Sequence, residues 1–195
     1  MYRIIILLLV CLSLYSCKPP TYTPKPRGFF NIALPKHDYK PFNEAGFPYS
    51  FEYASYATVI KDTSFFGQKP ENPYWIYVDY PTLGGRLYIS YKQISGVKDL
   101  AKMLEDTHYM SYFHSKKADY IEEPPFKNPN GVSGILYTIG GNAASAYQFI
   151  ATDSVHHFLR GALYFDVTPN ADSLRPVNDF IKKDIEHMLY TLKWK

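Results

Sequence analysis

The 195-residue sequence has only two cysteines, and its longest apolar run, Ile4 to Leu14, is eleven residues, about half of what a membrane-spanning helix needs. Charge of one sign is also lacking, because 21 Lys and Arg against 18 Asp and Glu leave a net charge of +3. So weak and evenly spread a charge does not suit phosphate backbones, and we expect no nucleic-acid partner. With 46% hydrophobic and 17% aromatic residues, the composition is that of a globular domain.

The N-terminal segment has the pattern of a secretory signal, with Arg3 before the apolar run. The string Leu14-Tyr15-Ser16-Cys17 resembles a bacterial lipobox. That resemblance implies cleavage before Cys17 and attachment of acyl chains such as palmitate to it, with residues 1–16 as the lipoprotein signal peptide. A buried N-terminal strand or an ordinary cleavable signal is the alternative interpretation.

The mature chain is then expected to have no free thiol, because Cys11 leaves with the signal and Cys17 is acylated. This excludes internal disulfides, Cys-ligated zinc, iron–sulfur clusters and a cysteine nucleophile. Two or more acyl chains hold a protein stably on a membrane, so we expect a membrane-anchored body that does not cross the bilayer. Residues 17–33 form the lipidated cysteine and a Pro-rich tether, predicted to be extended by four prolines between Lys18 and Arg27.

Residues 34–195 are predicted to form one α+β domain, a mostly antiparallel sheet covered by two helices. Its pattern resembles the PsbP or Mog1 type. Alternating apolar residues and turn signals predict six strands. These lie between Ser50 and Lys61, around Tyr74–Tyr80 and Leu87–Tyr91, and over Val132–Ile139, Ala144–Thr152 and His157–Val167.

Two helices are predicted from apolar spacing. The first runs from about Val97 to Ala118 with Ser95 as its cap. Its expected buried stripe is Val97, Leu100, Ala101, Leu104, His108 and Ser111 or Tyr112. The second begins near Ser173 and buries Leu174, Val177, Ile181, Ile185, Met188 and Leu192.

The most unusual string is Gly140-Gly141-Asn142-Ala143-Ala144-Ser145. It is not a phosphate-binding loop, because no Lys-Ser or Lys-Thr pair follows and the chain continues into a predicted strand. A hairpin turn explains it, since Gly and Asn tolerate positive φ. The functional alternative is a loop that a partner approaches closely, with Gly140, Gly141, Asn142 and Ser145 as the candidate partner-binding residues.

Ser145, Asp153 and either His156 or His157 supply the residue types of a hydrolytic triad. Members of such triads normally converge from distant segments, and no Gly-x-Ser-x-Gly elbow is present. Adjacent histidines on a strand point to opposite faces, so we expect one in solvent and the other in the core. We therefore predict no catalytic residues and no enzyme.

Two acid–histidine pairs, Glu105 with His108 and Asp184 with His187, are spaced i, i+3 on the predicted helices. Neither pair has a third ligand whose position the sequence fixes, so an acid–histidine pair on the helix surface explains each of them better than a metal site does. Glu122-Glu123 is interpreted as a solvated strand end. No metal and no cofactor is expected.

Tyrosine is abundant, at 19 residues, and six of them cluster in the first third of the body, between residues 49 and 80. Outward rings suit sugars or protein interfaces, whereas inward rings fill the core, and both readings stay open. The six are Tyr49, Tyr53, Tyr56, Tyr74, Tyr77 and Tyr80.

Three segments and the C-terminus together resemble the gliding motility lipoprotein GldD of Bacteroidetes. They are Ile89–Lys92, His114–Ile121, Tyr137–Ser145 and Leu192–Lys195. The resemblance implies a part in surface gliding, which is tied to type IX secretion and its envelope proteins, and it brings no catalytic residues. In lipoproteins of such bacteria an acidic cluster after the cysteine resembles a surface-export signal. Its absence here favours the periplasmic face of the outer membrane.

The resulting hypothesis is a non-enzymatic assembly or scaffold lipoprotein. It would contact the membrane through its lipid and bind other gliding or type IX secretion proteins of the envelope. One alternative is a glycan-binding module, which needs several coplanar exposed tyrosine rings in one groove. The other is a serine hydrolase, which needs Ser145 close to an imidazole.

Overall fold

The computed structural model describes residues 2, 31–64 and 69–195. Ala33–Lys195 forms one compact unit, and Met1–Ile32 is assigned to another. The predicted signal peptide, Cys17 and most of the predicted tether lie outside the described residues. Within the described ranges, no helix has both the length and the hydropathy needed to cross a membrane.

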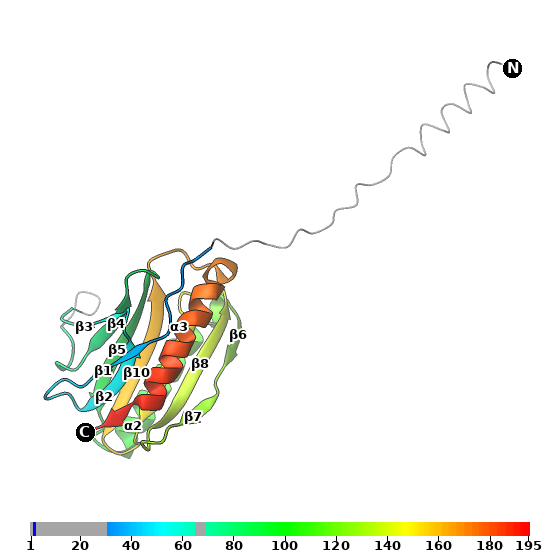
Figure 1. Cartoon of the computed structure of the whole chain (residues 1–195). Helices are drawn as coiled ribbons and strands as arrows, with labels where there is room; N and C mark the ends of the chain where they lie inside the picture. Colours follow the sequence, from blue (N-terminus) through cyan, green and yellow to red (C-terminus); the bar gives the residue numbers. More distant parts are fainter. Residues whose placement is uncertain (1, 3–30, 65–68) are drawn as a thin grey trace. The chain divides into compact units, whose positions relative to one another are not determined.

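The body is built on an antiparallel sheet of eight strands (Figure 1). Seven follow one another in the order β3-β4-β5-β10-β9-β8-β6, and β7 also pairs with β8. Their bounds are β3 Thr58–Lys61, β4 Ile76–Tyr80, β5 Gly85–Gln93, β6 Ala118–Glu122, β7 Pro125–Lys127, β8 Ser133–Gly141, β9 Tyr147–Thr152 and β10 His157–Phe165. The predicted α+β class with a mostly antiparallel sheet and two helices is confirmed.

A second, three-stranded sheet has the order β1-β2-β11. Its strands are β1 Tyr39–Phe42, β2 Tyr49–Ala54 and β11 Lys193–Trp194. The central strand β2 packs against helix α3, Ala171–Thr191. Strands β1 and β2, near the start of the described body, therefore lie in one small sheet with the C-terminal strand β11 (Figure 1).

Helices α2 and α3 cover opposite faces of the large sheet. A Cβ on Gly85 would lie 3.1 Å from Ile181 Cδ1, so alternate residues of β5 that share its side face α3. On the other face Ile150 and Phe158 pack with residues of α2, Val97–Tyr112. Cover on both faces explains why β9 is buried along its whole length and why β10 has no exposed residue.

The prediction for α3 is confirmed in its stripe, since Val177, Ile181, Ile185 and Met188 are buried. The helix starts earlier than expected, with Asn170 as the N-cap, whose side chain accepts a hydrogen bond from Ser173 N. Pro176 lies inside the helix.

The prediction for the first helix is wrong in three respects. The α-helix ends at Tyr112, and a 3-10 turn, η1 (Phe113–Lys116), follows. Gly96 occupies the N-cap without a side-chain bond. Of the predicted stripe, Ser111 is buried and Leu100 packs on the core, whereas Val97 is 85% exposed and the buried Thr107 was not predicted.

The single strand predicted between Ser50 and Lys61 is two strands that belong to different sheets, β2 and β3. The turn between them includes a hydrogen bond from Ala57 N to Ala54 O. Strands β1, β6, β7 and β11 were not predicted. They are short and lack a clear apolar alternation, and their pairing with neighbouring strands stabilises them.

Candidate functional site

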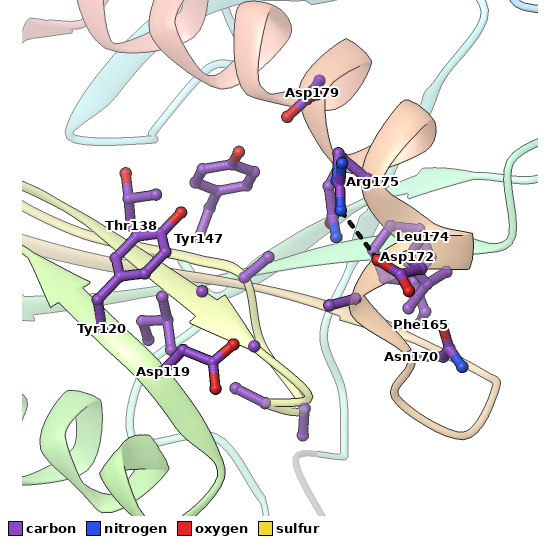
Figure 2. Close-up of a pocket in the computed structure, with 18 residues that line it drawn as sticks. Asp119, Tyr120, Thr138, Tyr147, Phe165, Asn170, Asp172, Leu174, Arg175 and Asp179 are labelled. Atoms are coloured by element: carbon purple, nitrogen blue, oxygen red, sulfur yellow. Dashed lines mark hydrogen bonds and ion pairs between the residues drawn. The ribbon is translucent and has the colours of Figure 1, made fainter. Parts of the chain in front are cut away.

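A hollow of about 320 Å³ lies where the N-terminal turns of α3 meet the ends of β6 and β8. Gly140 and Gly141 from the predicted loop line it, together with Ala143 and Ala144. Figure 2 shows the rings of Tyr120 and Tyr147 on one side of this hollow and Arg175 with Asp172 on the other. The structure thus places the candidate loop at the rim of a pocket.

Gly140 leaves room for the aromatic ring that packs over it. It pairs with Tyr120 of β6, and a Cβ on Gly140 would lie 2.2 Å from Cε1 of that ring. Gly141 has a φ of 89°, a conformation that L side chains rarely adopt. The two glycines let β8 turn while the Tyr120 ring, 53% exposed, lies flat at the pocket rim.

Asn142 ties the loop to helix α3. Its Oδ1 accepts a hydrogen bond of 2.9 Å from Ala171 N, one of the backbone donors that a helix start leaves without a partner. Asn170 Oδ1 accepts a second one, from Ser173 N at 3.0 Å. The Asn142 side chain therefore has a structural role at the start of α3, although Asn142 is exposed to solvent.

Ser145 lies under the loop. It is fully buried, and its Oγ donates to Tyr147 O at 3.2 Å. A bond from Ile139 N to Ala146 O closes the hairpin beside it. Ser145 supports the loop from inside and does not reach the pocket surface.

The pocket is rich in acceptors. Three carboxylates line it, from Asp119, Asp172 and Asp179, whereas Arg175 supplies the cationic group among the lining residues. Arg175 Nη2 already donates to Asp172 Oδ1 at 2.9 Å. Burial raises the pKa of Tyr147, and the negative charge of Asp179 raises it further. The site therefore attracts positive charge.

One further acceptor in this pocket is Asn178. Its Oδ1 is buried and has no hydrogen-bond partner among the described residues. A buried carbonyl oxygen without a donor is costly, so Asn178 adds to the demand for a donor from outside.

The residues of the hypothetical hydrolytic triad are not brought together. Ser145 precedes β9, whereas His157 begins β10 at the opposite end of that strand pair, where Phe158 pairs with Thr152. Asp153 Oδ1 accepts backbone hydrogen bonds from three residues of its own turn, His157 among them.

The expectation for the adjacent histidines is confirmed. His156 is exposed, whereas His157 is half-buried and its ring stacks on Trp194 at 5.0 Å. His157 Nδ1 forms a hydrogen bond of 2.8 Å with Tyr91 Oη. Its ring therefore belongs to the packed interior behind β11.

The two acid–histidine pairs differ from each other. Glu105 and His108 are both exposed, and His108 lies 3.7 Å from Glu123. Asp184 is 2% exposed and does not pair with His187, so its interpretation as part of a helix-surface pair is wrong. In the described part of the chain, no group of three or more His, Cys, Asp and Glu is arranged to hold a metal.

The tyrosines of the first third fill the core and its margin. Tyr49 and Tyr80 are buried, and the other four are half-buried. On the sheet face, the rings of Tyr77 and Tyr88 are inclined by 43° and those of Tyr88 and Tyr164 by 70°. These rings form no coplanar platform of the kind that a stacked sugar needs.

Sequence reasoning missed the pocket residues outside the loop, namely Tyr120, Tyr147 and the acidic turns of α3. Tyr120 follows a segment predicted as helix, and α3 is far away in sequence. The spacing of Asp172, Arg175 and Asp179 along one helix end was the available signal.

Comparison with known proteins identifies the family of this chain. A search of curated proteins finds no match. The solution structure of cyanobacterial PsbP (CyanoP) from Synechocystis sp. PCC 6803 is similar with a TM-score of 0.46 and 10% sequence identity, over 84% of this chain and 96% of that chain. The family model of the gliding motility lipoprotein GldD matches residues 19–194. Because that match covers most of the sequence, the chain belongs to the GldD family of gliding motility lipoproteins.

Proposed function

We propose that this protein is a non-enzymatic assembly component of the gliding machinery that docks an envelope partner at the pocket beside the Gly140–Gly141 loop. The partner would belong to the gliding apparatus or to the linked type IX secretion system. The protein would be held by acyl chains on Cys17 at the periplasmic face of the outer membrane, with residues 18–33 as its tether. Family membership supports the machinery, and the pocket supports the docking.

The observation that carries the docking proposal is a loop fixed at two points beside one exposed ring, that of Tyr120. Asn142 fastens the loop to the start of α3, and Ser145 anchors it from below. Tyr120 nevertheless leaves more than half of its surface in solvent. A rigid loop with an exposed aromatic residue loses little conformational entropy when a partner binds.

Charge in the pocket points to a basic side chain of the partner. Asp119 and Asp179 are exposed at the rim, and Arg175 is already paired with Asp172. A Lys or Arg side chain could place its apolar stem against Tyr120 and donate to these acceptors. The ring of Tyr147 already has a cation near it, since Lys182 Nζ lies 5.7 Å from its centroid.

A site-specific crosslink tests the proposal. A photo-crosslinking residue in place of Ala144, which is exposed at the rim, should capture one or more gliding or type IX secretion proteins in living cells. The same residue at Glu105, exposed on α2, should not capture them. Identical captures from both positions would contradict docking at the pocket.

A matched pair of variants tests the charge. Asp119→Asn with Asp179→Asn should weaken the crosslink from position 144 and slow gliding, at unchanged protein level. Glu105→Gln removes an exposed carboxylate elsewhere and should leave both unchanged. Normal gliding and crosslinking in the double variant would refute the basic partner side chain.

The anchor is tested separately. Mass analysis of the purified mature protein should show acylated Cys17 at its N-terminus. Cys17→Ala should release the protein from the outer-membrane fraction. An intact leader, or an outer membrane fraction that keeps the variant, would contradict the anchor without affecting the docking site.

A further inference from the structure

A second hollow, of about 230 Å³, lies between α2 and the face of the large sheet opposite α3. Its walls are mostly apolar, with Met103 and Met110 from α2 and Phe158 from β10. Arg160, two residues beyond Phe158 on the same side of β10, also lines it. A buried guanidinium therefore lies beside the apolar part of this cleft.

Arg160 is cationic and lacks a carboxylate partner among the described residues. Its Nη2 donates to Gln148 Oε1 at 2.8 Å, and a hydrogen bond also joins its side chain to Tyr164. Its Nε is buried and has no partner in the described part of the chain. Burial lowers the pKa of Arg160, and burial together with the positive charge of Arg160 lowers that of His114.

Gln148, next to Arg160, also has a hydrogen-bond donor without an acceptor. It is fully buried, and its Oε1 accepts from both Arg160 Nη2 and Ser111 Oγ, the latter at 3.2 Å. Its Nε2 has no partner among the described residues. Two neighbouring buried donors, Arg160 Nε and Gln148 Nε2, therefore have no acceptor, and a buried cation without a counter-charge is costly.

The other charges at this hollow do not neutralise Arg160. Lys92 lines the cleft and forms an exposed pair with Glu71 at 2.9 Å. Asp106 is the carboxylate among the lining residues, and it is exposed to solvent, where its charge is screened.

We infer that this cleft binds a small monocarboxylate with a short apolar chain. The carboxylate would accept from Arg160, the side chain best matched to its planar geometry, and the chain would lie between Met103, Met110 and Phe158. Methionines adapt readily to such tails. At about 30 Å³ per water-sized group, the volume holds roughly eight non-hydrogen atoms, the size of hexanoate.

Methionine methyl NMR of the mature protein with hexanoate tests the inference directly. Met103 and Met110 line the cleft, whereas Met188 is buried on α3 at the opposite face and serves as an internal control. Hexanoate should shift the methyl signals of Met103 and Met110 in a saturable way and leave that of Met188 in place. No saturable shift, or an equal shift of all three, overturns the site.

Chemical controls separate the carboxylate from the tail. Hexanol and hexylamine carry the same chain without an anion, and inorganic phosphate carries an anion without a chain. Hexanol and hexylamine should bind at least about tenfold more weakly than hexanoate, because a hydrogen bond to a carboxylate is worth more than one to a neutral group and an ammonium is repelled by Arg160. Phosphate should also bind at least about tenfold more weakly, because it buries no apolar chain. Equal binding of hexanol or of phosphate overturns the monocarboxylate assignment.

A pair of variants completes the test. Arg160→Gln should weaken hexanoate binding by about tenfold or more, whereas Lys183→Gln removes an exposed cation on α3 and should leave the affinity unchanged. If Arg160→Gln fails to fold, Met103→Trp, which fills the cleft from the half-buried α2 side, should abolish the shift of Met110. Unchanged affinity in a folded Arg160→Gln variant refutes the inference.

Discussion

His37 and Asp184, 147 residues apart in sequence, are joined by a hydrogen bond of 2.8 Å from Nδ1 to Oδ1. Asp184 lies in α3 and is 2% exposed. Its carboxylate also accepts from Tyr39 Oη at 3.2 Å and from Tyr56 Oη. Three donors, from the segment before β1, from β1 and from the turn after β2, thus surround one helix carboxylate and fasten the N-terminal segment of the body to α3.

Replacement of Asp184 should be the most destabilising polar substitution on α3. Asp184→Ala leaves His37, Tyr39 and Tyr56 without their acceptor, and loss of one partner from a buried charged network costs about 3–5 kcal/mol. The free energy of unfolding in urea measures it. Lys183→Ala, the exposed neighbouring position, should change that energy by no more than about 0.5 kcal/mol. Similar losses from both variants would show that Asp184 is not the centre of the network.

Alkaline pH should destabilise the fold. Burial, then the charge of Asp184 and the hydrogen bond to it, raises the pKa of Tyr39 from 10 to about 12, and burial raises those of Tyr49 and Tyr80 as well. The unfolded chain therefore loses these protons first, so stability is complete below about pH 10 and falls as pH rises towards 12.

The urea midpoint and the tyrosinate absorbance, followed together along a pH series, check this. Tyr39→Phe should make the decline shallower, whereas Tyr190→Phe, at an exposed position, should leave it unchanged. A midpoint that stays constant through this window would contradict the prediction.

Two glycines that face aromatic rings should respond differently to alanine. A Cβ on Gly161 would lie 2.0 Å from Phe149 Cε1, and that ring is buried and cannot move away. Gly161→Ala should cost about 1–3 kcal/mol or more. Gly140→Ala meets Tyr120, whose exposed ring can swing outward, so it should cost less than about 1 kcal/mol while it displaces the ring from the pocket.

Urea unfolding of both variants and the crosslink from position 144 give the comparison. Gly140→Ala should remain folded and lose crosslinking. Equal destabilisation by the two substitutions would mean that the Tyr120 ring is held as firmly as that of Phe149.

Asn142 should contribute to stability as a helix cap. Asn142→Ala removes the acceptor of Ala171 N and should cost about 1 kcal/mol, comparable to Asn170→Ala at the N-cap itself. Asn142→Asp keeps an acceptor and adds a negative charge at the helix start, so stability should be retained or rise by about 0.3–1 kcal/mol. Thermal unfolding ranks the three variants. A loss from Asn142→Asp as large as that from Asn142→Ala would exclude the capping role.

The accuracy of the helix predictions depended on what each helix packs against. Helix α3 covers an apolar sheet face, so spacing of Val177, Ile181 and Ile185 identified its buried side. Helix α2 covers the face that contains Gln148 and Arg160, and there polar Thr107 and Ser111 point inward. The spacing of apolar residues could not identify the buried side of α2, because part of that side is polar.

The site was half predictable for a similar reason. The Gly140–Ser145 string predicts a loop, because glycine and asparagine are favoured in turns and are uncommon inside strands. Its setting depends on α3, which begins 29 residues after Asn142 and approaches the loop only in the folded sheet. The Asp184 network was missed for the same reason, since its donors lie some 130 to 150 residues upstream.

The small sheet also sets the order in which the body can finish folding. Its middle strand β2 pairs with β1 on one side and with β11 on the other. A chain delivered amino end first can form the β1–β2 hairpin early, but β2 keeps one bare edge until Lys193 and Trp194 arrive. Closure of this small sheet therefore waits for β11, and until then the unpaired edge of β2 is open to pairing with other strands.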